Sequence, residues 1–175
     1  MRDSLSEKFN LFFIERIPLL STLILMFISF VPMDFVQLDY FRPLIGLLCV
    51  YYWTLKRSDL FSYCSAFMVG FFIDIYSSSP LGLNILLMLC VTTITYRLAH
   101  YFQGASFGAG WFIFGLVGLG MMLLKWLLLM IYFGRILPAT EAFFNYLSTV
   151  MFYPLIVLIN IKLQNRFLPQ EYVNE

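Results

Sequence analysis

The sequence predicts an all-α integral membrane protein, a compact bundle of six transmembrane helices with both termini in the cytoplasm. The first observation is composition: 61% of the 175 residues are hydrophobic and 12% are charged, whereas soluble domains average about 45–50% and about 25%. The second is a mean hydropathy of +0.84. This value indicates a membrane protein, because a soluble core of this length cannot bury so much apolar surface. The third is a division into six apolar runs, since a spanning helix takes roughly 20 residues.

The first half of the chain holds three predicted spans, at about residues 17–31, 43–55 and 60–76. In residues 1–16, apolar residues recur at helical spacing between charges, which predicts a short interfacial helix. The second span is short for a full crossing and ends at Lys56-Arg57, so it should tilt little or be flanked by thinned bilayer. The third span ends at the turn Ser77-Ser78-Ser79-Pro80.

The second half holds the other three predicted spans, at about residues 81–98, 107–133 and 142–161. The fifth is longer than a crossing requires and should tilt or bend. Pro154 lies inside the sixth and has no backbone N–H to donate. It should therefore kink this helix or leave a carbonyl free for a polar neighbour.

The basic residues indicate the orientation, because cytoplasmic loops carry an excess of lysine and arginine. Six spans with the N-terminus inside leave two basic residues outside, Arg42 and Arg135, and place Lys125 within the fifth span. The other eight of the eleven lie on the cytoplasmic side, namely Arg2, Lys8, Arg16, Lys56, Arg57, Arg97, Lys162 and Arg166. Five or seven spans would move the last two outside, so the pattern favours six.

Aromatic residues near two inner helix ends fit the same layout. Tyr51, Tyr52 and Trp53 adjoin the basic end of the second span, and Trp111 lies near the inner end of the fifth. Aromatic side chains are enriched at both membrane–water interfaces. The sequence therefore predicts an aromatic belt at these positions.

Asp74 lies near the outer end of the third span, where a carboxylate is costly unless it is protonated, paired or in contact with water. One reading is an interfacial acid that caps the first amides of the fourth span or is solvated. A second pairs it with Arg42, and a third makes it part of a proton or substrate relay. Gly70 lies on the same helix face. Small residues on that face, which also include Ser62 and Ala66, would let another helix approach closely.

The fifth span combines a deep lysine with small residues. Lys125 lies roughly 12–14 Å along the helix from Gly134 at a rise of about 1.5 Å per residue. At this depth the alternatives are structural ion pairing, snorkelling and substrate binding. A narrow arc of small residues can seat a neighbouring helix, either within the bundle or from a partner protein. This stripe consists of Gly104, Gly108, Gly115 and Gly118.

Residues for catalysis or metal binding are scarce. The single histidine is His100, and the sequence contains no G-x-S-x-G, no H-E-x-x-H and no Walker-type glycine loop. Cys49, Cys64 and Cys90 lie in apolar stretches without a C-x-x-C pattern and are expected to be small buried residues. The net charge of +1 gives no basic face for nucleic acid. We therefore expect no catalytic residue, no cofactor and no metal.

Several short motifs follow one another between the second and fourth spans. They are Phe41-Arg42-Pro43, Tyr52-Trp53, Gly70-Phe71-Phe72-Ile73-Asp74-Ile75 and Ser77-Ser78-Ser79-Pro80-Leu81-Gly82-Leu83-Asn84. In this order they resemble the bacterial rod shape-determining protein MreD family, in which a helix ending in G-x-x-x-D meets a serine-bearing turn and then L-G. The resemblance covers about residues 41–90. Tyr153-Pro154 and the segment from Lys162 to Phe167 are also similar.

This resemblance implies a non-catalytic, multi-pass inner-membrane subunit of the machinery that builds the lateral wall of rod-shaped bacteria. The family works with the bitopic periplasmic protein MreC, and through it with MreB and the RodA–penicillin-binding protein synthase. Its fold is similar to the substrate-binding membrane subunits of energy-coupling-factor vitamin transporters. The positions that the resemblance marks, as outer-face or helix-packing determinants, are Arg42, Pro43, Asp74, Pro80, Leu81 and Gly82. With Gly70, Gly108, Gly115, Gly118 and Lys125 they are the candidate structural or partner-interface residues.

Two functions from different classes follow. In the first, the chain is a scaffold that binds the membrane helix of MreC. In the second, it is a transporter subunit that binds a vitamin-like small molecule in an outward cavity lined by Asp74, Arg42 and the Ser77–Ser79 turn. Depletion of the protein should round the cells in the first case. In the second it should create a nutrient requirement at normal cell shape.

Overall fold

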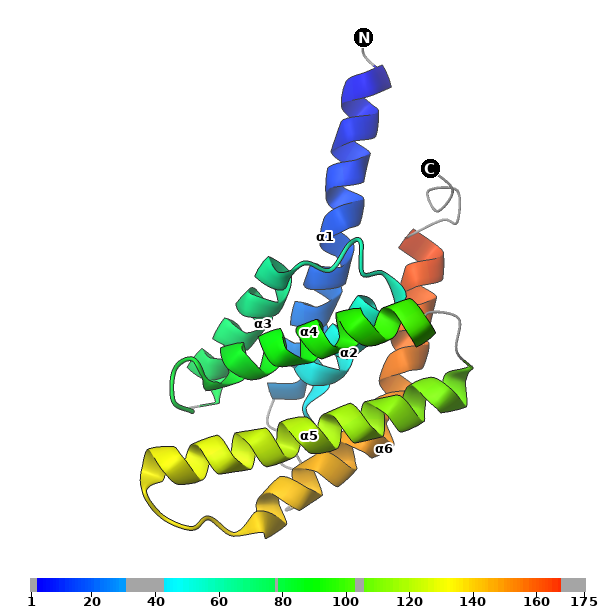
Figure 1. Ribbon diagram of the computed structural model, residues 1–175. Coiled ribbons are helices and arrows are strands. Elements are labelled where there is room, and N and C mark those ends of the chain that lie inside the picture. The colour runs from blue at the N-terminus through cyan, green and yellow to red at the C-terminus, as the bar shows by residue number, and fades with distance from the viewer. Residues whose placement is uncertain (1–2, 31–42, 78, 103–105, 168–175) are drawn as a thin grey trace.

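The computed structural model describes residues 3–30, 43–77, 79–102 and 106–167, with side chains from Arg16 to Arg166 within these ranges. These residues form six helices and no strand, packed as Figure 1 shows. The helices are α1 (Asp3–Phe30), α2 (Ile45–Lys56), α3 (Tyr63–Tyr76), α4 (Leu83–Phe102), α5 (Phe107–Phe133) and α6 (Ala139–Phe167). Because α1 is one continuous helix, the short interfacial helix expected over residues 1–16 is not a separate element.

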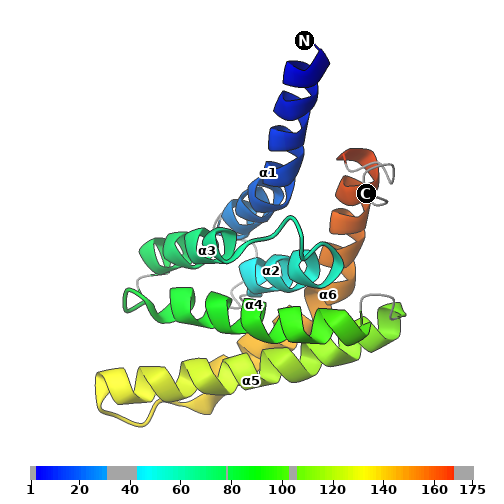
Figure 2. The same ribbon diagram turned by 45° about the horizontal axis from the view of Figure 1, so that its top comes forward.

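Helix α2 lies inside the bundle. All residues from Gly46 to Leu55 are buried, because α1, α3, α4 and α6 pack around this helix (Figure 2). Its 12 residues span about 18 Å at 1.5 Å per residue, well short of a hydrocarbon core of about 30 Å. The second predicted span is therefore a helix enclosed by protein.

The aromatic side chains of α2 form the core of the bundle. Tyr51, Tyr52 and Trp53 are each at most 3% exposed. The Tyr51 hydroxyl donates a hydrogen bond to the Gly110 carbonyl of α5 at 3.1 Å, and the Tyr52 hydroxyl donates one to Gln164 Oε1 of α6 at 2.8 Å. The expectation that these three residues form an interfacial belt is wrong, because α2 faces other helices and not lipid.

Three helices are long and apolar enough to cross a membrane: Leu83–Phe102, Phe107–Phe133 and Ala139–Arg166. Two shorter apolar segments are Arg16–Phe30 and Tyr63–Tyr76. Large apolar side chains point away from the bundle, for example Phe112, which is 77% exposed. Helices that are apolar on all sides are typical of membrane spans. The expected helical membrane bundle is confirmed, whereas helix length alone does not establish six crossings.

Helix α6 contains Pro154 and changes direction along its length: its first half runs beside α5 and its second half turns away (Figure 1). A proline cannot donate to the carbonyl four residues earlier, which here belongs to Val150. The indole N–H of Trp111 in α5 donates to that carbonyl at 3.1 Å. The expectation that Pro154 frees a carbonyl for a polar neighbour is confirmed.

The three cysteines are free. Cys49 is buried in α2, where its sulfur accepts a hydrogen bond from Asn160 Nδ2 at 3.7 Å. Cys90 is half-buried and Cys64 is exposed. Burial was therefore correctly expected for Cys49 and wrongly for Cys64, which lies in the first turn of α3 and points outward.

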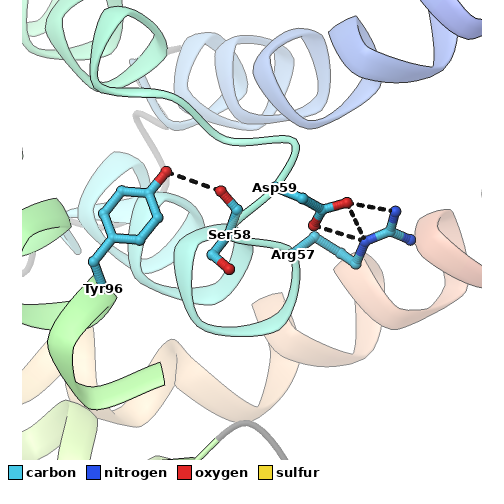
Figure 3. A network of polar contacts seen from close by, with 4 residues as sticks. All are labelled: Arg57, Ser58, Asp59 and Tyr96. Carbon is cyan, nitrogen blue, oxygen red and sulfur yellow. Dashed lines mark hydrogen bonds and ion pairs between the residues drawn. The ribbon is translucent and has the colours of Figure 1, made fainter. Parts of the chain in front are cut away.

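The turn between α2 and α3 is held by side-chain contacts (Figure 3). The Arg57 guanidinium pairs with the Asp59 carboxylate at 2.9 Å. The Tyr96 hydroxyl of α4 donates to the backbone carbonyl of Ser58 at 2.9 Å, as Figure 3 shows. The same hydroxyl is within hydrogen-bond distance of the Phe61 carbonyl. Burial alone would raise the pKa of Asp59, but the hydrogen bonds and charge of Arg57 outweigh it, so this pKa lies below its usual value. The turn is thereby tied to α4.

We expect Tyr96→Phe to lower the free energy of unfolding by about 1–2 kcal/mol, because the carbonyls of Ser58 and Phe61 lose the one hydroxyl donor that they share. Thermal unfolding of the detergent-solubilised protein measures this as a lower Tm. Tyr101→Phe is the matched control, since Tyr101 lies on the same helix and is 79% exposed. Equal Tm values for the two variants would contradict the role of the Tyr96 hydroxyl.

Candidate functional site

Asp74, in the last turn of α3, holds the start of α4. Its side chain is 2% exposed. Oδ2 accepts a hydrogen bond from the N–H of Gly82 at 2.8 Å, and Oδ1 accepts one from the N–H of Asn84 at 2.9 Å. The first N–H groups of a helix have no partner within it and carry partial positive charge, which a carboxylate offsets. Among the alternatives predicted for Asp74, the described residues show capping of the fourth span.

Side chains of the same turn complete the contacts of the carboxylate. Asn84 Nδ2 donates to Asp74 Oδ1 at 2.9 Å and to Ser79 Oγ at 2.8 Å. The hydroxyls of Ser77 and Ser79 lie 2.7 Å apart, and Ser79 also donates to Asp74 at 3.3 Å. Asn84, which is 2% exposed, ends the serine-bearing motif in the sequence but is not among the predicted site residues. The sequence feature that could have pointed to this residue is a single amide side chain at the start of an otherwise apolar span.

The predicted ion pair of Asp74 involves a residue outside the described part of the chain, Arg42, so that pairing stays a prediction. Asp74 itself is buried, and both of its oxygens accept hydrogen bonds from the turn and the start of α4. Neither Asp74 nor Ser77 and Ser79 line the two cavities described below. The carboxylate therefore acts here as a structural cap.

Gly70 brings the backbones of α3 and α4 into contact. A Cβ atom at this position would lie 2.5 Å from Ile85 Cα and 2.9 Å from the Asn84 carbonyl oxygen. These are backbone atoms, which cannot rotate away as a side chain can. Ala66, one turn earlier on the same face, is fully buried. The close approach of another helix to this small-residue face is confirmed, and the helix is α4.

The turn that follows Asp74 depends on one glycine conformation. Gly82 has a φ of +97°, in the left-handed region that favours glycine. The carbonyl of Pro80 accepts a hydrogen bond from the N–H of Leu83 at 3.1 Å. Leu81 is 78% exposed, and Pro43, half-buried, lies two residues before the start of α2 at Ile45. A role of these residues at a partner interface stays a prediction.

An open apolar groove of about 510 Å³ runs between α5 and α6, and we call it the α5–α6 groove. A Cβ atom on Gly108 would meet nothing within 4 Å, and one on Gly115 would lie 3.7 Å from the Tyr146 hydroxyl. That hydroxyl donates to the Gly115 carbonyl at 3.0 Å, which ties α6 to α5 beside the groove. The lining residues are Gly108, Trp111, Phe112, Gly115, Leu116, Leu119, Tyr146 and Val150.

The predicted glycine stripe is divided in the structure. Gly108 and Gly115 open onto the α5–α6 groove. Gly118 is buried, and a Cβ atom on it would lie 3.5 Å from the Tyr146 ring. Gly104 lies outside the described residues. One part of the stripe therefore packs inside the bundle, while another faces outward.

A second cavity has a volume of about 490 Å³ and also has Tyr146 in its lining, and we call it the Lys125 cavity. Its walls come mainly from α5 and α6, with Leu44, Leu47 and Leu87 closing it from the α2 and α4 side. Charged side chains in its lining are Lys125, Arg135 and Glu141. Within the part of the chain that the structure describes, no three metal-ligating side chains lie together.

Lys125 has no hydrogen bond or ion pair to any described residue. The Asp74 carboxylate is already bound by N–H and O–H donors. Structural ion pairing by direct contact, one of the alternatives for this lysine, is therefore absent among the described residues. Lys125 lines the cavity that is named after it, and substrate binding by this lysine stays a prediction.

Comparison with protein families identifies the class of this membrane bundle. The family model of the rod shape-determining protein MreD matches residues 9–162. The match includes Gly70, Asp74, both cavities and nearly all of the six helices. The chain belongs to the MreD family, whose members are membrane proteins with a role in rod shape determination. No curated protein sequence and no solved structure matches the chain.

Proposed function

We propose that this protein is a non-catalytic scaffold of the bacterial inner membrane that binds MreC and helps to position lateral wall synthesis. In this proposal the chain crosses the membrane six times with both termini in the cytoplasm. Family membership supports the shape-determining role, and the distribution of basic residues supports the orientation. In Figures 1 and 2 the N-terminal end of α1 and the C-terminal end of α6 lie on the same side of the bundle.

The α5–α6 groove is the observation that carries the proposed interaction. It faces outward and is lined mostly by apolar residues. A Cβ atom would meet nothing within 4 Å at Gly108 and would make only an ordinary contact, at 3.7 Å, at Gly115. Gly108 and Gly115 are seven residues apart, about 10 Å along the helix. Small residues at this spacing let a second transmembrane helix approach the backbone closely. The occupant we propose is the single membrane helix of MreC, which would link this chain to MreB and the RodA–penicillin-binding protein synthase.

The groove is tested by the double variant Gly108→Leu, Gly115→Leu. The leucine side chains fill the space that the MreC helix would occupy, so the amount of MreC that co-purifies in detergent should fall at least tenfold, equivalent to about 1.4 kcal/mol. Cells that depend on this variant should lose their rod shape.

The matched control is Gly120→Leu. Gly120 lies on the same helix, a Cβ atom there meets nothing within 4 Å, and it is not part of the groove. We expect this control to retain MreC at the wild-type level. If the double variant and the control retain equal amounts, MreC does not bind in the groove. Two other results together would overturn the proposed scaffold function. The wild-type protein would capture no MreC, and cells depleted of the protein would keep their shape.

A further inference from the structure

We propose that the Lys125 cavity is a binding site for an amphiphile with a single anionic group, a carboxylate or a phosphate on a long apolar chain. This site is distinct from the groove proposed for MreC. The apolar chain would lie along the cavity walls, and the anionic group would pair with the Lys125 ammonium.

The size of the cavity fits a small molecule. Its volume is about 490 Å³, within the range of roughly 300–1,000 Å³ that is typical of ligand sites. The walls are largely apolar, with Phe114, Met121, Met122 and Leu129 among them. Few polar groups converge on such a space, and this combination is characteristic of sites that bind one oriented ligand.

Most polar side chains in the lining already have partners. The Trp126 indole donates to the Leu137 carbonyl at 3.1 Å, and the Tyr146 hydroxyl donates to the Gly115 carbonyl at 3.0 Å. The Thr149 hydroxyl is bonded to backbone as well. Lys125 is the charged group deep in this lining that has no hydrogen-bond or ion-pair partner among the described residues.

The charged side chains in the lining of the cavity favour an anionic ligand. Lys125 and Arg135 contribute two cations, and Glu141 contributes one carboxylate. Ile136, a lining residue in the loop between α5 and α6, is 89% exposed, so this end of the cavity is near the surface. Lys125 lies about 13 Å along α5 from Gly134, and at this depth in a membrane span a lysine is costly without an anionic partner.

Binding to the full chain in a neutral sugar detergent tests this proposal. The probes are palmitate, hexadecyl phosphate, the uncharged hexadecanol and inorganic phosphate, titrated against tryptophan fluorescence. Palmitate or hexadecyl phosphate should bind at least tenfold more tightly than hexadecanol, equivalent to about 1.4 kcal/mol. The tighter of the two charged probes identifies the headgroup as carboxylate or phosphate. Trp126 lines the cavity, so Trp126→Phe should remove most of the signal.

Two variants locate the anionic group and the chain. Lys125→Met removes the charge, keeps an unbranched side chain one atom shorter, and should abolish the preference for the charged probe. Lys162→Met, at an exposed lysine outside the cavity, should keep it. Ala142→Phe fills the cavity without changing its charge and should weaken binding of every long-chain probe at least tenfold, again about 1.4 kcal/mol.

Three results would overturn the proposal. The first is equal binding of hexadecanol and the charged probes to the wild-type protein. The second is an unchanged preference for the charged probe in Lys125→Met. The third is binding of inorganic phosphate as tight as that of hexadecyl phosphate, which would indicate an ion site without a chain. Because the readout is ligand binding, these results are independent of whether MreC occupies the groove.

Discussion

Gly70→Ala should destabilise the bundle by about 3 kcal/mol or more, the upper end of the cost of overpacking. The new Cβ atom would lie 2.5 Å from Ile85 Cα and 2.8 Å from the Ile85 backbone nitrogen. Neither atom can move without shifting α4 as a whole, and α4 is held at its start by Asp74. Thermal unfolding in detergent should show a large drop in Tm, together with a smaller yield of monodisperse protein.

Gly120→Ala is the matched control for Gly70→Ala. Gly120 also lies within a helix, and a Cβ atom there meets nothing within 4 Å. Alanine has a higher helix propensity than glycine by up to about 1 kcal/mol, so the control should be as stable as the wild type or slightly more stable. If Gly70→Ala is as stable as Gly120→Ala, α3 and α4 do not touch at this point.

Asp74→Asn should lower the free energy of unfolding by at least about 3 kcal/mol, because hydrogen bonds to a charged group contribute about 1.5–3 kcal/mol each. The amide carries no charge, and its NH₂ group would face the N–H donors of Gly82 or Asn84. The side-chain amide of Asn84 would lose its carboxylate acceptor inside the bundle. The measurement is the Tm of the purified protein, with amide hydrogen exchange at the start of α4 as a local readout.

Asp59→Asn provides the comparison for Asp74→Asn. The Asp59 side chain is 58% exposed, and an exposed ion pair contributes only about 0–1 kcal/mol.

We also expect the charge exchange of Arg42→Asp with Asp74→Arg not to restore stability, because the cap needs a carboxylate at residue 74. Restoration by the exchange would instead support the ion pair between these residues.

The features that depend only on neighbouring residues along one helix could be predicted from the sequence. The i, i+4 spacing of Ala66, Gly70 and Asp74 predicts a small face with an acid at its end, and the structure packs α4 on that face. The distance from Asp74 to the start of the fourth span is short enough that capping could be foreseen. The proline in α6 and its freed carbonyl could be foreseen too, although its donor, Trp111, could not.

Features that depend on which helices meet could not be predicted. The apolar side chains of α2 suit lipid and protein interior equally well, so composition does not reveal that Tyr51 and Trp53 are enclosed. The glycine stripe of α5 forms one arc on a helical wheel. Tyr146 of α6 divides it, and this requires the packing of α5 against α6. The Lys125 cavity likewise exists only once the start of α6 lies beside α5.

The short, enclosed α2 bears on how the chain enters the bilayer during synthesis. At about 18 Å it does not bridge a hydrocarbon core of about 30 Å by itself. Its main neighbours, α4 and α6, are synthesised after it. Insertion and tertiary assembly of this protein are therefore coupled, because α2 becomes a stable part of the membrane only when later helices close around it.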